Sequence, residues 1–166
     1  MGQLELHTDD LTLRTVSMKE LAEVVRTWDL IEGGISRGQA RGIIRRMRRS
    51  HRRNRIGRLE HLCLAVFEKG KGEIIGWCGL DGRCVPGRTV IFYLIARAYR
   101  GRGYATQCAR RLIAYAFEDA GLRRVDGGCA KDNAASRRVM EKAGMVLVGT
   151  EENGDFQFCV ERRKSR

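Results

Sequence analysis

The chain has 166 residues, a length that suits one domain, because a chain of this size can bury roughly two thirds of its unfolded surface around a single core. Apolar residues make up 43% of it, yet no apolar run approaches the roughly 20 residues that a transmembrane helix needs. The opening stretch, MGQLELHTDD, has no basic region that leads into an apolar one, so we expect no signal peptide. These features predict one cytoplasmic domain over residues 1–166 without a membrane partner, ending in a frayed basic tail at residues 162–166.

The balance of charge is strongly basic, with 32 Lys and Arg against 20 Asp and Glu and a formal net charge of +12. Such a surface attracts polyanions, but the charge alone leaves a nucleotide cofactor, RNA, a ribosome and an acidic peptide open as partners. Six cysteines are present, but no CxxC pair occurs and no His stands at zinc-ligand spacing. We therefore expect buried, reduced thiols and no metal site.

In the first third of the chain, a short alternating strand at residues 11–16 precedes two helices. Ser17 and Glu20 form an S-x-x-E capping box at the start of the first helix. That helix has apolar residues at helical spacing and stops at a Gly-Gly pair. The second helix covers residues 36–50, with a narrow apolar stripe and arginines on its other sides.

The rest of the chain alternates strands with helices. Two strands joined by the turn sequence KGKG form a predicted hairpin, and the final two strands meet at Asn153-Gly154, the strongest short hairpin signal. An amphipathic helix in between closes at Gly121. The predicted strands are residues 60–68, 73–80, 89–96, 125–130, 145–151 and 155–161, and the predicted helices are residues 105–120 and 133–143. The order is strand, two helices, three strands, helix, strand, helix, two strands.

The loop at residues 99–106, YRGRGYAT, lies between a strand and an amphipathic helix and has the composition of a diphosphate-binding site. A glycine-rich turn there lets successive backbone N–H groups point at one anion, and the helix N-terminus adds partial positive charge. Gly101 and Gly103 permit unusual dihedral angles and close approach. The neighbouring arginines supply charge, and Thr106 can add a hydroxyl. An ordinary arginine-rich tight turn is the alternative.

Spacing excludes two other phosphate-binding loops. The P-loop pattern G-x-x-x-x-G-K-[ST] requires a Lys, and none follows these glycines. The dinucleotide-binding pattern G-x-G-x-x-G begins at Gly101, but position 106 is Thr rather than Gly or Ala. Neither pattern fits the loop.

Two separated motifs carry a resemblance to a known family. Arg100-x-x-Gly103-x-Ala105 matches the Q/R-x-x-G-x-G/A motif of the GNAT superfamily of acetyltransferases. KDNAASRRVMEKAGMVLVGT is similar to the next motif of its ribosomal-protein-alanine acetyltransferase branch, N-x-x-S-x-x-V-x-E-K-x-G-F. The resemblance is strong over residues 93–150 and weaker over residues 11–80. It implies an acetyl-CoA-dependent N-acetyltransferase with an α/β (α+β) fold, in which a mixed sheet of six to seven strands has helices on both faces and splayed central strands hold CoA.

The resemblance also implies which residues bind acetyl-CoA, the co-substrate. Backbone amides of residues 101–106 bind the CoA diphosphate, and main-chain groups of the preceding strand pair with the pantetheine arm. Asn133 matches an asparagine that contacts CoA in the family, and Asn is also a favourable helix N-cap, so both roles are compatible. The implied cofactor-binding residues are Tyr93, Leu94, Ile95, Arg100, Gly101, Arg102, Gly103, Tyr104, Ala105, Thr106, Asn133 and Ser136.

The catalytic groups depart from the commonest family pattern. Acyl transfer from a thioester to an amine needs a neutral amine, a donor for the oxyanion and an acid for the leaving thiolate. Many relatives supply the acid from a Tyr seven residues after the asparagine, but here that position is Met140. The resemblance implies Ser136 as the acid instead, and a local helix cap is its structural alternative.

For the base we expect Glu152, one of three acidic residues around the final hairpin, although turn carboxylates are often only solvated. His61 is a further candidate, with a structural role in an apolar strand as its alternative. A base is dispensable if the enzyme selects an amine that is already neutral, since an α-amino group has a pKa near 8.

Ten arginines occupy residues 37–58, and five of them are spaced by four: Arg37, Arg41, Arg45, Arg49 and Arg53. Like charges along a helical ridge repel one another by about 0.2–0.5 kcal/mol per pair, so we expect either a compensating partner or a solvated basic face. In acetyltransferases of this fold the region borders the acceptor groove.

Three functions remain open. The first is acetylation of a protein N-terminus or a ribosomal protein, with the arginines docking on RNA or an acidic peptide. The second is acetylation of a small-molecule amine, and the third is a nucleic-acid-binding or ribosome-binding module without catalysis. The first is the function we expect, in a monomer or a homodimer.

Overall fold

The strand at the middle of the chain is apolar on both faces, and this places the core in two layers. The computed structural model describes residues 4–162, without the side chains of residues 29–32. In β3 (His61–Glu68), the buried residues alternate between two clusters. Leu62, Leu64 and Val66 belong to one cluster, and Cys63, Ala65 and Phe67 belong to the other. Because successive side chains of a strand point to opposite faces, both faces of the sheet must be covered.

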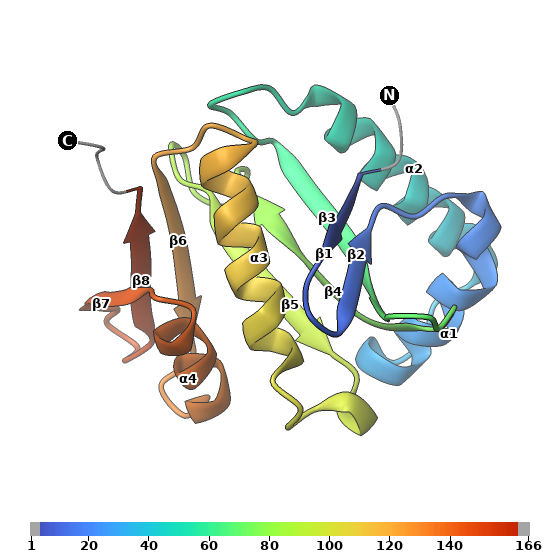
Figure 1. Ribbon diagram of the computed structural model, residues 1–166. Coiled ribbons are helices and arrows are strands. Elements are labelled where there is room, and N and C mark those ends of the chain that lie inside the picture. Colours follow the sequence, from blue (N-terminus) through green and yellow to red (C-terminus); the bar gives the residue numbers. More distant parts are fainter. Residues whose placement is uncertain (1–3, 163–166) are drawn as a thin grey trace.

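The helices and strands follow the predicted order, with one strand more (Figure 1). The strands are β1 (Glu5–His7), β2 (Leu11–Arg14), β3, β4 (Ile74–Asp81), β5 (Val90–Ile95), β6 (Arg124–Cys129), β7 (Val146–Thr150) and β8 (Phe156–Glu161). The α-helices are α1 (Leu21–Glu32), α2 (Arg37–Arg53), α3 (Tyr104–Glu118) and α4 (Ala134–Lys142). The unexpected strand is β1, whose pairing with β2 holds it although only Leu6 is buried.

The eight strands form one mixed sheet in the order β1-β2-β3-β4-β5-β6-β8-β7. Every neighbouring pair is antiparallel except β5 and β6, which run parallel at the middle of the sheet. The sheet therefore has one more strand than the six to seven that the sequence predicts, and it has the expected mixed character.

The helices cover both faces, as predicted (Figure 1). Buried residues of α1 and α2, including Val24 and Ile44, pack in the cluster that contains Cys63 and Phe67. Buried residues of α3, including Leu112, pack in the cluster of the opposite face. None of the helices among the described residues combines the length and apolarity of a bilayer span.

The helix starts follow local capping. The Ser17–Glu20 capping box forms, but it opens a 3₁₀ turn (Met18–Glu20) before α1 begins. A second capping box between Ser36 and Gln39 starts α2, which continues to Arg53, beyond the predicted end at residue 50. Asn54 then ends the helix and joins it to the sheet, since its Oδ1 accepts from the N–H groups of Glu60 and His61 at 2.8 and 3.2 Å.

The expectation about the cysteines is partly met, and the expectation about the basic tail stays a prediction. All six cysteines are free thiols, and four of them are buried, but Cys84 is exposed and Cys129 is half-buried. The predicted basic tail at residues 162–166 lies outside the described residues except for Arg162, whose N–H donates to the carbonyl of Arg123 at 2.9 Å.

Gly79 of β4 lies where a side chain has no space. A Cβ at this position would collide with the carbonyl oxygen of Leu62 and lie 2.5 Å from Cζ of Phe92. Overpacking of this kind costs about 1–3 kcal/mol, so Gly79→Ala should lower the free energy of unfolding in urea by that amount. Gly72→Ala is the matched control, since nothing lies within 4 Å of a Cβ there. Equal stability of the two variants would contradict this packing.

Candidate active site

The parallel strands β5 and β6 separate over most of their length. Their register contains one pair, Val90 with Asp126, and the N–H of Asp126 donates to the carbonyl of Thr89 at 2.9 Å. On its other edge β5 pairs with β4 from Val90 to Ile95. The β6-facing edge of β5 beyond Val90 therefore forms no strand pairs within the described chain, which is the splayed geometry that the family resemblance implied.

Residues Tyr93, Leu94 and Ile95 lie on this open stretch of β5. One of their main-chain groups is already occupied, because Nε of Arg100 donates to the carbonyl of Ile95 at 2.8 Å. Arg100 therefore fixes the path of the chain as it leaves the strand. Its side chain is anchored to the backbone in addition to any role with an anion.

The loop after β5 has the conformation of an anion site. Gly101 and Gly103 adopt φ values of 80° and 79°, in the left-handed region that favours glycine. The first backbone hydrogen bond of α3 runs from Gln107 N to Gly103 O at 3.1 Å. The N–H groups of Tyr104, Ala105 and Thr106 precede it, and none of them has a hydrogen bond to another described residue. These N–H groups at a helix N-terminus can bind a diphosphate.

A nearly buried carboxylate stands beside this loop. Glu68 accepts hydrogen bonds from the Tyr104 hydroxyl and from Lys71 Nζ, each at 2.6 Å, and lies 3.4 Å from Nη1 of Arg102. The bonds from Lys71 and Tyr104 lower the pKa of Glu68 below its ordinary value. Arg102 also lies over the ring of Tyr99, 5.5 Å from its centroid. Part of the positive charge that the sequence assigned to the loop is thus balanced by Glu68.

Asn133 and Ser136 lie at the start of α4. Asn133 Oδ1 accepts from Ser136 N at 3.0 Å, so Asn133 is the N-cap of α4. Ser136 Oγ lies 2.9 Å from the hydroxyl of Tyr93, which also donates to the Ser136 carbonyl at 3.2 Å. Burial raises the pKa of the Tyr93 phenol, which therefore stays protonated. Met140, at the position where relatives have a Tyr, is a buried core residue.

The phenol of Tyr93 is a functional candidate that the sequence reasoning missed. Only the main chain of Tyr93 was expected to act, because the family motif places a tyrosine on the helix instead. The signal was a tyrosine in the strand that precedes the loop, combined with the methionine at position 140. In the structure, the Tyr93 hydroxyl of β5 meets Ser136 at the start of α4.

Glu152 lies in the turn between β7 and β8 and is exposed. Phe156, the first residue of β8, pairs with Cys129 at the end of β6, so the turn stands beside the open end of the β5–β6 gap. Asp155 accepts from the N–H of Lys131 at 3.2 Å. For Glu152 no hydrogen bond or ion pair to another described residue is present. The turn is near the gap, but nothing in the described chain orients this carboxylate.

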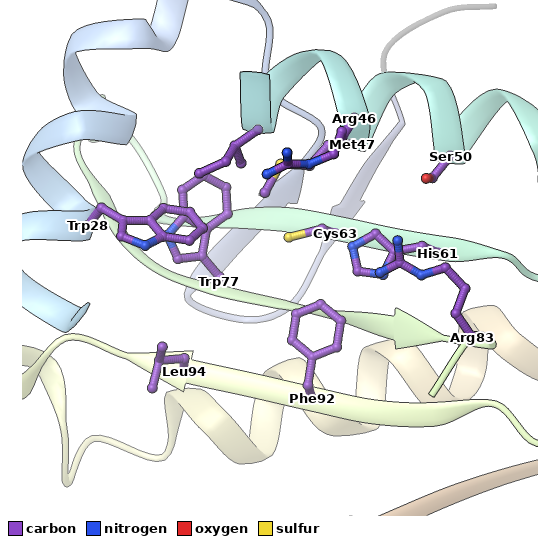
Figure 2. Close-up of a pocket in the computed structure, with 11 residues that line it drawn as sticks. Trp28, Arg46, Met47, Ser50, His61, Cys63, Trp77, Arg83, Phe92 and Leu94 are labelled. Carbon is purple, nitrogen blue, oxygen red and sulfur yellow. The ribbon is translucent and has the colours of Figure 1, made fainter. Parts of the chain in front are cut away.

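A cavity of about 320 Å³ opens on the face of β5 that α1 and α2 cover, opposite the face on which Tyr93 contacts Ser136 (Figure 2). Its walls come from α1, α2, β3, β4 and β5, and they are mostly apolar. The lining residues are Trp28, Ile43, Arg46, Met47, Ser50, His61, Cys63, Trp77, Arg83, Phe92 and Leu94. The rings of Trp28 and Trp77 lie 5.6 Å apart at one end of it, and His61 and Arg83 lie at the other (Figure 2).

His61 is paired with a carboxylate at this second end. Its Nδ1 lies 3.0 Å from Oδ2 of Asp81, and its ring stacks on Phe92 with centroids 5.8 Å apart. Arg83 donates to both oxygens of Asp81, which holds the pKa of that carboxyl far below its usual range. Burial, reinforced by Arg83, lowers the pKa of His61, and Asp81 opposes this shift. His61 is accordingly neutral at physiological pH. Within the described chain, no cluster of His, Cys, Asp and Glu could hold a metal ion.

Comparison with known proteins places this architecture in a family. A family model for an acetyltransferase (GNAT) domain matches residues 5–146. The chain is 34% identical over 100 residues to the uncharacterized protein YkkB of Bacillus subtilis (strain 168), in a match that covers 59% of this chain and 58% of YkkB. The chain therefore spans less than two thirds of the length of this curated relative.

Two solved structures share the fold at low identity. The ribosomal-protein-S5-alanine acetyltransferase of Vibrio fischeri superposes with a TM-score of 0.79 at 14% identity, over 95% of this chain and 96% of that one. RimL, a ribosomal L7/L12 alpha-N-protein acetyltransferase in complex with coenzyme A, gives 0.76 at 16% identity, over 95% and 98%. Together with the family match over most of its length, the splayed strands and the loop at the start of α3 show that the chain belongs to the GNAT family of acetyltransferases.

Proposed function

We propose that the protein is an acetyl-CoA-dependent N-acetyltransferase that transfers acetyl to a primary amine by direct attack. The observation that carries this proposal is the position of β5. Its open edge leads to the anion-binding loop, and its other face forms a wall of the aromatic cavity. A thioester that lies along this strand is reached by an acceptor from the cavity.

In this proposal the cofactor runs from the loop to the middle of β5. The N–H groups of residues 101–106 bind the diphosphate, and main-chain groups of Tyr93, which face the open edge, pair with the pantetheine arm. Asn133 contacts CoA from the N-terminus of α4 while it caps that helix. The acetyl group then lies between Phe92, which faces the cavity, and Tyr93, which faces Ser136.

The reaction needs one proton to leave the amine and one to reach the thiolate. The amine nitrogen forms a bond to the acetyl carbon, the carbon–sulfur bond breaks, and a base takes the amine proton. Ser136 gives its hydroxyl proton to the thiolate and recovers one from Tyr93, whose phenol is 2.9 Å away. The raised pKa of Tyr93 keeps that proton available at neutral pH.

For the acceptor we propose a protein N-terminus or a ribosomal protein. The arginines of α2 support this choice: Arg37, Arg41, Arg45, Arg46, Arg48, Arg49, Arg52 and Arg53 are all exposed. Among all ten arginines of residues 37–58, one salt bridge is present in the described chain, from Arg53 to Glu60 at 3.4 Å. Arg46 belongs both to this basic face and to the wall of the cavity. Two structural relatives are named as acetyltransferases of ribosomal proteins.

A small-molecule amine is the second candidate, and the cavity itself favours it. Its volume of about 320 Å³ is at the lower end of small-ligand sites, and its two tryptophans suit a compact apolar group. An N-terminal residue with an apolar side chain also fits this space, so the test must separate the two.

The loop is tested by two alanine variants with equal backbone strain. Gly103 and Gly87 have φ values of 79° and 74°, and a Cβ meets no atom within 4 Å at either position. Gly103→Ala should weaken CoA binding at least 10-fold in calorimetric titration, because strain at that residue displaces the N–H groups that bind the diphosphate. Gly87→Ala should bind CoA as the wild type does. If both variants bind CoA with equal affinity, the diphosphate does not bind at this loop.

The acid is tested at Ser136 and Tyr93. Ser136→Ala and Tyr93→Phe should each lower kcat about 100-fold, a loss typical of a removed general acid, while the CoA dissociation constant stays within about twofold. The double variant should be no slower than the slower single variant, because the two hydroxyls act as a unit. Unchanged turnover of Ser136→Ala would exclude this serine from proton transfer.

The acceptor is tested with acidic hexapeptides that begin with Ala or Ser, and with tryptamine and spermidine, by thiol release from acetyl-CoA. The peptides should react with the higher kcat/KM. Reversing Arg41, Arg45 and Arg49 to Glu should raise the KM for the peptides at least 10-fold and leave that for tryptamine unchanged. Reversing the exposed residues Lys19, Lys69 and Arg123 is the control of equal charge. If CoA causes no thermal shift while RNA binds with a steep salt dependence, the protein is a nucleic-acid-binding module instead.

A further inference from the structure

Among the described side chains that line the cavity, one can accept a proton at neutral pH. Arg46 and Arg83 line it as permanent cations, and Ser50 has only a hydroxyl. Cys63 also lines it, but burial raises the pKa of its thiol to about 12, so it stays protonated. The remaining ionisable lining residue is the imidazole of His61. Of the described lining residues, His61 is therefore the one that can act as a base inside this cavity.

We propose that His61 is the general base of acetyl transfer, with Asp81 holding its Nδ1 so that Nε2 accepts the proton of the acceptor amine. The inference rests on the proposed function of the chain as an N-acetyltransferase. It places the base on β3, in the wall of the acceptor cavity, instead of at Glu152 in the β7–β8 turn.

The ring of His61 is held in a fixed orientation from three sides. The Asp81 carboxylate lies 3.0 Å from Nδ1, and Phe92 stacks on the ring at an interplanar angle of 8°. Asn54 holds the backbone of His61, accepting from its N–H and donating Nδ2–H to its carbonyl at 3.2 Å. A carboxylate on one nitrogen of an imidazole fixes the tautomer and stabilises the imidazolium that forms when the other nitrogen takes a proton.

Two tautomers compete at Nδ1 of His61, because Arg83 Nη2 lies 2.9 Å from the same nitrogen that Asp81 approaches. A guanidinium only donates and a carboxylate only accepts. Arg83 Nη2 also donates to Asp81 Oδ2 at 2.7 Å, and Nε donates to Oδ1 at 3.0 Å. Nη2 keeps a second proton after its bond to Asp81, and donation of that proton to Nδ1 would place the ring proton on Nε2. The proposal requires the other tautomer, in which Nδ1–H donates to Asp81 Oδ2 and the lone pair is on Nε2.

Strand β5 places the acid and the base on opposite sides of the thioester. Phe92 and Leu94 point into the cavity that His61 lines, whereas Tyr93 between them contacts Ser136 of α4. The amine consequently loses its proton on the cavity side, and the thiolate gains one on the α4 side. One proton moves to His61, and one leaves the pair of Ser136 and Tyr93, so a turnover is completed when solvent takes the proton from His61 and returns one to Tyr93.

The charged groups around His61 fix the sign of the pH dependence. Asp81 and Glu60 favour the imidazolium, while burial and Arg83 disfavour it and prevail; Arg46 of α2 adds another positive charge to the same cavity. The base must be neutral, so kcat/KM falls as pH falls through the pKa of His61. Because that pKa is lowered from 6.5, the acidic limb should lie below pH 6.5.

The kinetic test compares His61→Gln with Glu152→Gln, using the Ala-initiated acidic hexapeptide and tryptamine as acceptors. His61→Gln should lower kcat about 100-fold and abolish the acidic limb, with the CoA dissociation constant unchanged. Glu152→Gln should retain the kcat and the pH profile of the wild type. Asp81→Asn should lower kcat and move the limb to lower pH, because a carboxylate that raises the pKa of His61 is lost. Loss of activity in Glu152→Gln with a normal His61→Gln enzyme would overturn the proposal.

A second measurement does not depend on turnover. The protein has three histidines, so the ¹⁵N and ¹H resonances of His61 can be assigned by comparison with His61→Gln, in the CoA-bound protein at pH 7. The expected state is a neutral ring with its proton on Nδ1. A proton on Nε2, or an imidazolium at pH 7, would exclude His61 as the base. If the wild type neither binds CoA nor releases thiol, the proposed function fails, and the tautomer still reports on this site.

Discussion

The unequal pairing of the two edges of β5 is the constraint on which the rest of the site depends. One edge is paired with β4 along the whole strand, and the other pairs with β6 at Val90 alone. Unpaired backbone groups inside a protein need partners, so the open edge requires a ligand with alternating donors and acceptors. A pantetheine arm supplies amide groups of this kind. The paired edge meanwhile keeps the strand rigid, so that the ligand enters a gap whose one wall is already fixed.

Alternation along β5 then divides the chemistry between two faces. Phe92 and Leu94 face the cavity under α1 and α2, and Tyr93 faces α4. An amine acceptor and a leaving thiolate have opposite requirements, since one must lose a proton and the other must gain one. Groups with opposite tasks on one face would exchange protons with each other directly. The strand keeps them apart while each remains beside the same residues of the backbone.

The sequence predicted the order of the elements and the loop, because both depend on local signals. Hydrophobic periodicity, capping boxes and glycines at turns act over a few residues, and they located α1 to α4 and seven strands within a few residues of their ends. Strand β1 was missed because a single buried residue makes no pattern. The splay of β5 and β6 was implied by the family motif alone. The contacts of Tyr93 with Ser136 and of His61 with Asp81 join different elements, so no local pattern could reveal them.

The pair of His61 with Asp81 shows how a small irregularity controls such a contact. Near the turn, β3 and β4 pair Phe67 with Ile74, and an unbroken ladder from that pair would place His61 opposite Leu80. A register shift between Val66 and Phe67 inserts one residue, and His61 lies opposite Asp81 instead. Because one residue of slip moves every side chain to the other face, Leu80 packs in the α3-side cluster while Asp81 faces His61. The bulge is therefore as necessary to this arrangement as the two side chains, and a hairpin of the same composition without it would place an aliphatic residue beside the imidazole.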